Sequence, residues 1–220
     1  MIKKIFILLG LFISLNSLAQ PGSSSEKLSW IFGIGWNVVD DNGKPFKKLF
    51  DVPNAWSIPW HPSQLSAEVI GKKGFTYGGI FNYNKYKSGK TINNKKISGS
   101  FLFFSLDGFA KYHFNEIYLI HPRLDPYVVG GLGYTLRFIS PYNNTATLNF
   151  GFGTNFWINS YVGLNLQSVS KFGLRSPFFK SGSNYLHHSI GIIVILDRTA
   201  KKRYSFIKAR YSWIHRKPAG

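Results

Sequence analysis

The residues best suited to chemistry in this sequence form a short run, His187-His188-Ser189. Residues two apart in a β-strand point to the same side, so His187 and Ser189 would share a face. An imidazole beside a hydroxyl can remove its proton and create a nucleophile, as lipid-modifying acyl hydrolases and transferases require. The acid that completes such a set is missing, because the next acid is Asp197 at the far end of the same segment. We therefore favour interfacial hydrogen bonding and assign no catalytic residue.

A second set of polar side chains stands opposite the apolar faces of alternating segments. It comprises Glu68, Asp107, Lys111, Arg137, Asn165 and Gln167, with Lys171 as a further candidate. Inside a narrow barrel, unpaired charges are costly and opposite charges should pair. The set is either a gated ion path or a salt-bridged polar plug, and we favour the plug. No His/Asp/Glu spacing suits a metal and no glycine-rich loop suits a phosphate, so we expect no cofactor.

The elements that must position these side chains are segments of about ten residues in which apolar and polar residues alternate, although Phe101 and Phe103 blur the pattern near the start of one segment. In 146–158, Leu148, Phe150 and Phe152 fall on one face, while Asn149 and Gly151 fall on the other. Eight such segments are expected, at 28–38, 63–71, 75–84, 99–114, 125–138, 146–158, from 162 onward, and at 185–196. Apolar alternation repeated around a ring is typical of a membrane β-barrel. We predict an all-β fold, an eight-stranded antiparallel up-and-down transmembrane β-barrel; the alternative is a soluble, aromatic-rich β-sandwich.

The N-terminal residues resemble a secretory signal peptide. Lys3 and Lys4 precede an apolar run, and Ser17-Leu18-Ala19 offers a cleavage site. The run is shorter than the roughly 20 residues that span a bilayer. The chain has no cysteine, which excludes lipoprotein anchoring, disulfides and thiolate metal sites. The expected organisation is a signal peptide at 1–19, a barrel at 20–197 and a basic periplasmic tail at 198–220.

The chain is strongly basic, with 27 Lys and Arg against 9 Asp and Glu. Export makes nucleic acid a poor partner, whereas anionic lipid headgroups, surface polysaccharide, peptidoglycan or an acidic protein suit the charge. The expected partners are outer-membrane lipid and lipopolysaccharide. One cluster lies in a loop and comprises Lys85, Lys87, Lys90, Lys95 and Lys96. Another lies in the tail, where the candidate docking residues are Lys201, Lys202, Arg203, Trp213, Arg216 and Lys217. The tail is either a docking segment for a periplasmic partner or a basic extension without structure.

Several motifs, taken in order, resemble the barrel domain of OmpA-like outer-membrane proteins. They are residues 36–43 (WNVVDDNG), 126–134 (PYVVGGLGY), 149–157 (NFGFGTNFW) and 186–191 (LHHSIG), within a match over 28–197. The resemblance implies an eight-stranded barrel in the outer membrane of a Gram-negative cell. The family often adds a periplasmic peptidoglycan-binding domain, and this sequence departs from that pattern after its basic tail. Non-enzymatic members of the family also carry the His and Ser found here at 188 and 189.

Together these features favour a non-enzymatic outer-membrane barrel with both termini in the periplasm. It would stabilise the envelope or serve as an accessory subunit of an outer-membrane machine for assembly, secretion or motility. Two alternatives stay open: a lipid-modifying acyl hydrolase or transferase, and a narrow pore.

Overall fold

The computed structural model describes residues 29–41, 52–92, 95–116, 123–139, 144–174 and 184–196. Eight long strands dominate these residues: β1 (Trp30–Asp40), β3 (Gln64–Ile70), β4 (Phe75–Tyr86), β7 (Phe101–His113), β8 (Leu124–Arg137), β9 (Asn144–Trp157), β10 (Val162–Gly173) and β11 (Tyr185–Ile195). The shorter elements are β2 (Trp56–Ser57), β5 (Thr91–Ile92), β6 (Lys95–Lys96) and the 3₁₀ helix η1 (Phe114–Glu116). The signal peptide and basic tail expected from the sequence lie outside the described residues.

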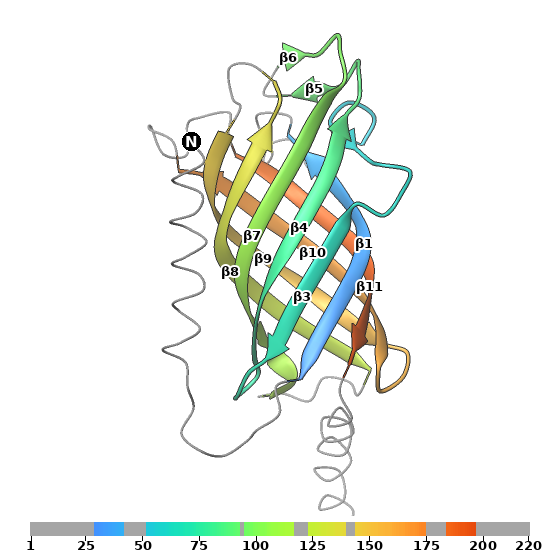
Figure 1. Cartoon of the computed structure of the whole chain (residues 1–220), viewed down its shortest axis with the longest axis vertical. Helices are drawn as coiled ribbons and strands as arrows, with labels where there is room; N and C mark the ends of the chain where they lie inside the picture. The colour runs from blue at the N-terminus through green and yellow to red at the C-terminus, as the bar shows by residue number, and fades with distance from the viewer. Residues whose placement is uncertain are drawn as a thin grey trace, which may run out of the picture.

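The long strands form one closed antiparallel barrel. Each pairs with the next long strand along the chain, and β11 pairs with β1 from Ile31↔Ile195 to Asp40↔Leu186. Closure gives every long strand a partner on both sides, which removes the exposed edges that would otherwise invite aggregation. Figure 1 shows the strands inclined to the long axis of the barrel. The eight-stranded up-and-down barrel predicted from alternation is confirmed.

The two ends of the barrel differ. At one end, which we call the terminal end, β1 begins and β11 ends, and short connections join β3 to β4 and β9 to β10. At the other, the loop end, the small β5–β6 sheet rises above the rim (Figure 1). Among the described residues, no helix is long and apolar enough to cross a membrane.

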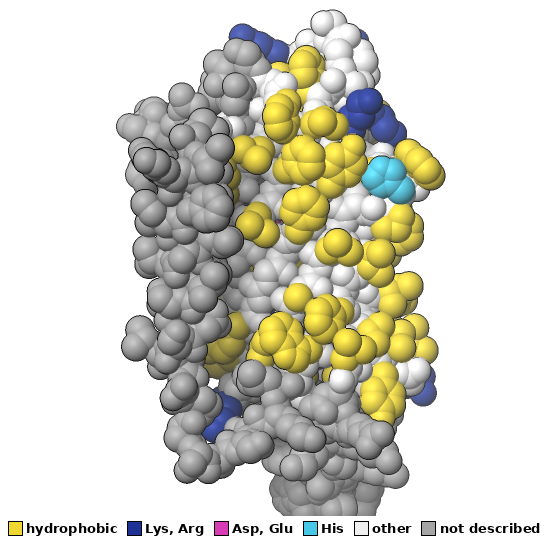
Figure 2. Space-filling model, viewed as in Figure 1, with side chains coloured by type: hydrophobic (Ala, Val, Ile, Leu, Met, Phe, Trp, Pro, Cys, Tyr) yellow, Lys and Arg dark blue, Asp and Glu magenta, His cyan; other side chains and the backbone are white. Residues whose placement is uncertain are grey.

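The outer face of the barrel is apolar. Large exposed side chains follow every second position, for example Leu132 at 61% exposure on β8 and Phe152 at 68% on β9. The positions between them are buried, as in the run eBeBiBe at the start of β9. Figure 2 shows these apolar side chains over one wall, with basic side chains near the two ends. A solvent-facing sheet would carry polar residues there, so this face is suited to lipid.

Two local features differ from the sequence-based expectations. The lysine-rich segment after β4 was expected to be a loop, yet it contains the β5–β6 pair, with Thr91 opposite Lys96. The apolar residues Ile92 and Ile97 stabilise this strand pair, because both side chains are buried against Tyr86, Phe103 and their neighbours at the barrel mouth. The long connection after β1 also contains β2, which extends the sheet beside Val39 and Asp40.

Candidate functional site

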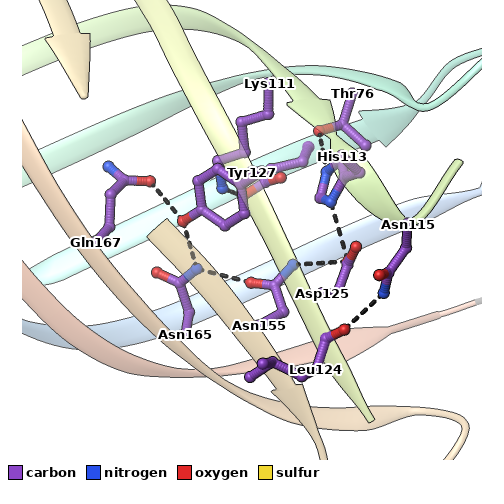
Figure 3. A network of polar contacts seen from close by, with 11 residues as sticks. Thr76, Lys111, His113, Asn115, Leu124, Asp125, Tyr127, Asn155, Asn165 and Gln167 are labelled. Carbon is purple, nitrogen blue, oxygen red and sulfur yellow. Dashed lines mark hydrogen bonds and ion pairs between the residues drawn. The ribbon is translucent and has the colours of Figure 1, made fainter. Parts of the chain in front are cut away.

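The polar interior is the candidate site, and its lower part is a hydrogen-bonded chain near the terminal end (Figure 3). Lys111 on β7 forms an ion pair with Glu68 on β3, across β4. Gly78 stands opposite Glu68 on β4, so no side chain separates the pair there. The Lys111 ammonium also lies 4.6 Å from the centre of the Tyr127 ring.

The chain continues through Tyr127 across β8, β9 and β10. The Tyr127 hydroxyl donates to Gln167 Oε1 at 2.9 Å and accepts from Asn165 Nδ2 at 2.7 Å. Asn165 also donates to Asn155 Oδ1 at 2.7 Å. The last links reach Asp125, which accepts from Asn155 at 3.3 Å and lies 2.9 Å from His113 Nδ1. Figure 3 shows these side chains converging from several strands on the barrel centre.

A second network occupies the middle of the barrel, around Asp107. Its carboxylate accepts from Lys171 Nζ at 2.6 Å and from Asn149 Nδ2 at 2.9 Å. Ser105 and Asn82 contribute further bonds at 3.1 and 3.4 Å. Glycine makes room for this network, because a Cβ on Gly133 would lie 1.9 Å from Asp107 Oδ1.

A third cluster lies at the loop end, where Arg137 forms an ion pair with Asp41 at 3.0 Å. Tyr86 donates a hydrogen bond to Asp41 at 2.9 Å, and the guanidinium lies 4.6 Å from the Tyr185 ring centre. Asp41 follows the last residue of β1. Burial of its carboxylate outweighs the attraction of Arg137 and raises the pKa of Asp41 to about 6.

Apolar layers separate and close these polar networks. Ile31, Ile193 and Ile195 form a buried cluster at the terminal end. A middle layer comprises Ile80, Phe109, Tyr127, Val129 and Val169. The loop end is filled by Val39, Tyr86, Ile92, Ile97, Phe103 and Tyr185. The interior therefore alternates polar and apolar layers along its length.

The structure places all six interior candidates from the sequence inside the barrel, and all are buried. Glu68 and Lys111 meet, and Asn165 and Gln167 meet through Tyr127. Asp107 and Arg137 join separate networks and take Lys171 and Asp41 as partners.

Sequence reasoning did not select three important members of these networks. Asp41 lies just beyond the first predicted strand, which was expected over 28–38, and so was not among the interior candidates. His113 and Asp125 stand at the ends of strands, where a side chain looks solvated. The spacing along the strand could have identified His113 as an interior residue. His113 is two residues after Lys111 and therefore shares its inward face.

The His187-His188-Ser189 run divides between the two faces of β11. His187 and Ser189 point inward and are buried, and within the described part of the chain neither His187 Nε2 nor Ser189 Oγ has a hydrogen-bond partner. His188 lies on the outer face, 2.9 Å from Ser168 Oγ through its Nδ1. Its ring lies 5.1 Å from that of Trp56, which donates to Asp40 at 3.1 Å. The geometry does not join His187 to Ser189 as base and nucleophile.

Other candidates add no chemistry to the described residues. In those ranges there is no group of three or more His, Cys, Asp or Glu side chains that could hold a metal. The candidate docking residues of the tail, 201–203, 213, 216 and 217, lie outside them.

The strand pairing, the apolar outer face and the filled interior define the class: a small, closed, membrane-type β-barrel of eight strands. No family model and no curated protein sequence matches the chain.

Solved structures resemble it at low identity. Neisserial surface protein A is 13% identical with a TM-score of 0.48, over 76% of this chain and 96% of its own. The outer membrane protein AlkL, determined in lipid bilayers, is 14% identical with a TM-score of 0.47, over 81% and 95%. Ail, the attachment invasion locus protein of Yersinia pestis, is 12% identical with a TM-score of 0.41, over 77% and 97%. The resemblance concerns the fold alone, and the assignment to the class depends on the chain's own strand pairing.

Proposed function

We propose that this protein is an integral outer-membrane β-barrel without a conducting channel and without enzymatic activity. In this proposal it stabilises the envelope or serves as an accessory subunit of an outer-membrane complex for assembly, secretion or motility. The observation that carries the proposal is the filled interior of the barrel.

A water-filled pore would leave its lining accessible to solvent. Here the inward side chains are buried at successive levels: Arg137 at 2% exposure near the loop end, Asn82 at 0% in the middle and Lys111 at 2% toward the terminal end. The buried cations Lys111, Arg137 and Lys171 each have an acid within ion-pairing distance. Eight strands enclose little more than packed side chains, so a closed barrel is the physical expectation as well.

The outer face supports insertion in a membrane. A strand of 12 residues such as β4 is about 40 Å long, and a tilt of about 40° reduces its height to about 30 Å. That height matches a hydrocarbon core of about 30 Å. A row of contacting rings marks the loop-end boundary and comprises Trp60, His61, Tyr83, Phe104 and Phe138. Aromatic rings of this kind favour the membrane–water interface.

The signal peptide predicted from the sequence and the even number of strands support an orientation with the terminal end in the periplasm. The basic tail at 198–220 would then face periplasmic proteins, and the barrel would contact outer-membrane lipid and lipopolysaccharide. A pull-down in mild detergent, with the full chain beside a version truncated after Asp197, tests the accessory role. Partners lost with the tail support docking, whereas identical empty pull-downs refute it.

Two measurements test the closed barrel itself. The full chain, expressed in a Gram-negative host, should fractionate with the outer membrane and change gel mobility on heating. Purified protein in planar bilayers should give no single-channel steps. Steps whose conductance changes in Arg137→Gln would show a continuous path through the interior and would overturn the proposal.

A further inference from the structure

The charges of the described residues are strongly segregated. Every acid whose side-chain burial is described is buried, and these acids are Asp40, Asp41, Glu68, Asp107 and Asp125. Exposed cations, in contrast, lie at both ends: Lys72 and Lys73 in the turn between β3 and β4 at the terminal end, and a larger group at the loop end that comprises Lys85, Lys87, Lys95 and Lys96. The barrel therefore uses its acids internally and presents cations at its end surfaces, with the larger group at the loop end. Such a surface attracts anions.

Two of these lysines continue an outward row of β4. Phe81, Tyr83 and Lys85 alternate along the strand and share its outer face, and Lys87 follows just after the strand ends. Tyr83 belongs to the aromatic row that marks the membrane boundary. Lys85 is thus the first charged outward residue above the apolar face of this strand. Lysines in that position extend their ammonium groups into the headgroup region.

Below Lys85, the same wall of the barrel is hollowed. A groove of about 550 Å³ crosses β11, β1, β3, β4 and β7 on the lipid-facing side. Ala67 and Gly79, paired across β3 and β4, form its floor, while Leu65, Phe81 and Leu106 border it toward the loop end. Figure 2 shows this wall with large apolar side chains near both ends and smaller residues between them. The groove has an apolar lining without a charged side chain, which suits a hydrocarbon chain better than a solvated ligand.

The depth between the groove and the lysines is close to half the thickness of the hydrocarbon core of a bilayer. Gly79 and Lys85 are six residues apart on β4, which is about 20 Å along the strand. A tilt of about 40° reduces this to about 15 Å of depth. The hydrocarbon layer of one leaflet is also about 15 Å thick, which is half of a core of about 30 Å. A lipid with its phosphate at the lysines would therefore place the end of an acyl chain over Gly79.

We propose that this wall is a binding site for an anionic phospholipid, whose phosphate leaves the headgroup with a net negative charge. Lys85 and Lys87 bind the phosphate, and one acyl chain lies over Phe81 and Leu106 into the groove at Gly79. The inference rests on the proposed membrane insertion and deepens it, because it names one lipid class and one position on the barrel.

The test measures lipid binding by the full-length protein in detergent with native mass spectrometry. The probes are dimyristoyl phosphatidylglycerol, which is anionic, and dimyristoyl phosphatidylcholine, which has the same chains without net charge. Lys85→Gln with Lys87→Gln should weaken phosphatidylglycerol binding roughly 30-fold, at about fivefold for each lysine near an anionic headgroup. Phosphatidylcholine binding should not change in this variant.

Two further variants separate the parts of the site. Gly79→Leu fills the groove without a backbone clash, because a Cβ there meets only Asp107 O at 3.6 Å. It should weaken both lipids. Lys95→Gln with Lys96→Gln is the matched control, since these exposed lysines lie on the raised β5–β6 sheet. It should leave both lipids bound as in the unmodified protein.

Three outcomes overturn the inference. Equal binding of the two lipids by the unmodified protein shows that net headgroup charge is not recognised, which removes the anionic-lipid site. An equal loss in the Lys95/Lys96 control shows a diffuse charge effect. A dimer that disappears in Gly79→Leu, with lipid binding intact, assigns the groove to a second copy of the chain. Heat-dependent gel mobility of each variant reports insertion separately, so failure of the lipid site is distinguishable from failure of the barrel.

Discussion

Replacing Asp107 by alanine is the sharpest perturbation of the sealed interior. The carboxylate accepts from Lys171 at 2.6 Å, from Asn149 at 2.9 Å and from Ser105 at 3.1 Å. In Asp107→Ala, the Lys171 ammonium keeps Ser105 Oγ at 3.1 Å and loses its acid. Lys171 is only 2% exposed, so water does not replace the lost partner.

The expected cost follows from that burial. Breaking a buried ion pair by removing one partner destabilises proteins by about 3–5 kcal/mol, because the remaining charge is uncompensated. Replacing both partners in Asp107→Leu with Lys171→Met removes the uncompensated charge, and such exchanges are often neutral or stabilising. The double variant should therefore be more stable than Asp107→Ala, with a large coupling energy between the two sites.

Urea-dependent folding into lipid vesicles measures these free energies, with heat-dependent gel mobility as the report of the folded barrel. Lys96→Ala serves as the control, because Lys96 is exposed and surface changes usually stay within about 0.5 kcal/mol. A loss below about 1 kcal/mol in Asp107→Ala would mean that water reaches Lys171. That result would refute the sealed interior and favour a conducting path.

Three further predictions address the wall, the loop end and the outer face. Gly131→Ala should destabilise the barrel or prevent folding, because the added Cβ would lie 2.2 Å from Gly108 O. In the control Gly108→Ala, the added Cβ meets nothing within 4 Å, so the same urea titration should show little change. The raised pKa of Asp41, about 6 against 3.8 for a free carboxyl, means that the folded state holds this proton more tightly than the unfolded state. The stabilisation from this group is therefore greatest below about pH 4, and it falls by about 3 kcal/mol as the pH rises through 6. In a series of urea titrations at different pH values, Asp41→Asn should show a smaller change in stability over this range. Leu132→Arg places a charge on the lipid-facing side of β8 and should cost about 2–4 kcal/mol near the bilayer midplane; an unchanged midpoint in urea would contradict a lipid-facing position.

The positions of the interior side chains followed from strand parity, but their pairing did not. Lys111 could in principle meet any inward acid, and it meets Glu68, which is 43 positions away. Lys171 meets Asp107 at a separation of 64 positions. Such pairs depend on the register of several strands and on closure between β11 and β1. Alternation along one strand carries no information about the register between strands.

Residues at the loop end show the same limit. Phe103 has the inward parity of Ser105, yet its aromatic character obscured the pattern until the structure placed it in the buried cluster at the barrel mouth. Leu186 lies on the same outward side of its strand as Ile190 and Ile192, but its exposure is only 5%. His188 is likewise outward and packs against Trp56. Contacts with segments distant in sequence decide burial at these positions.

The sequence by itself determined the strands, their two faces and the closed eight-stranded architecture, because side-chain direction alternates with a period of two and the apolar face repeats along the chain. Only the tertiary structure decided which charges pair, how the β5–β6 pair closes the mouth, and where the outer wall is hollowed beside Gly79. These features arise from the register between strands and from the packing of side chains across the barrel axis, which join residues far apart in sequence.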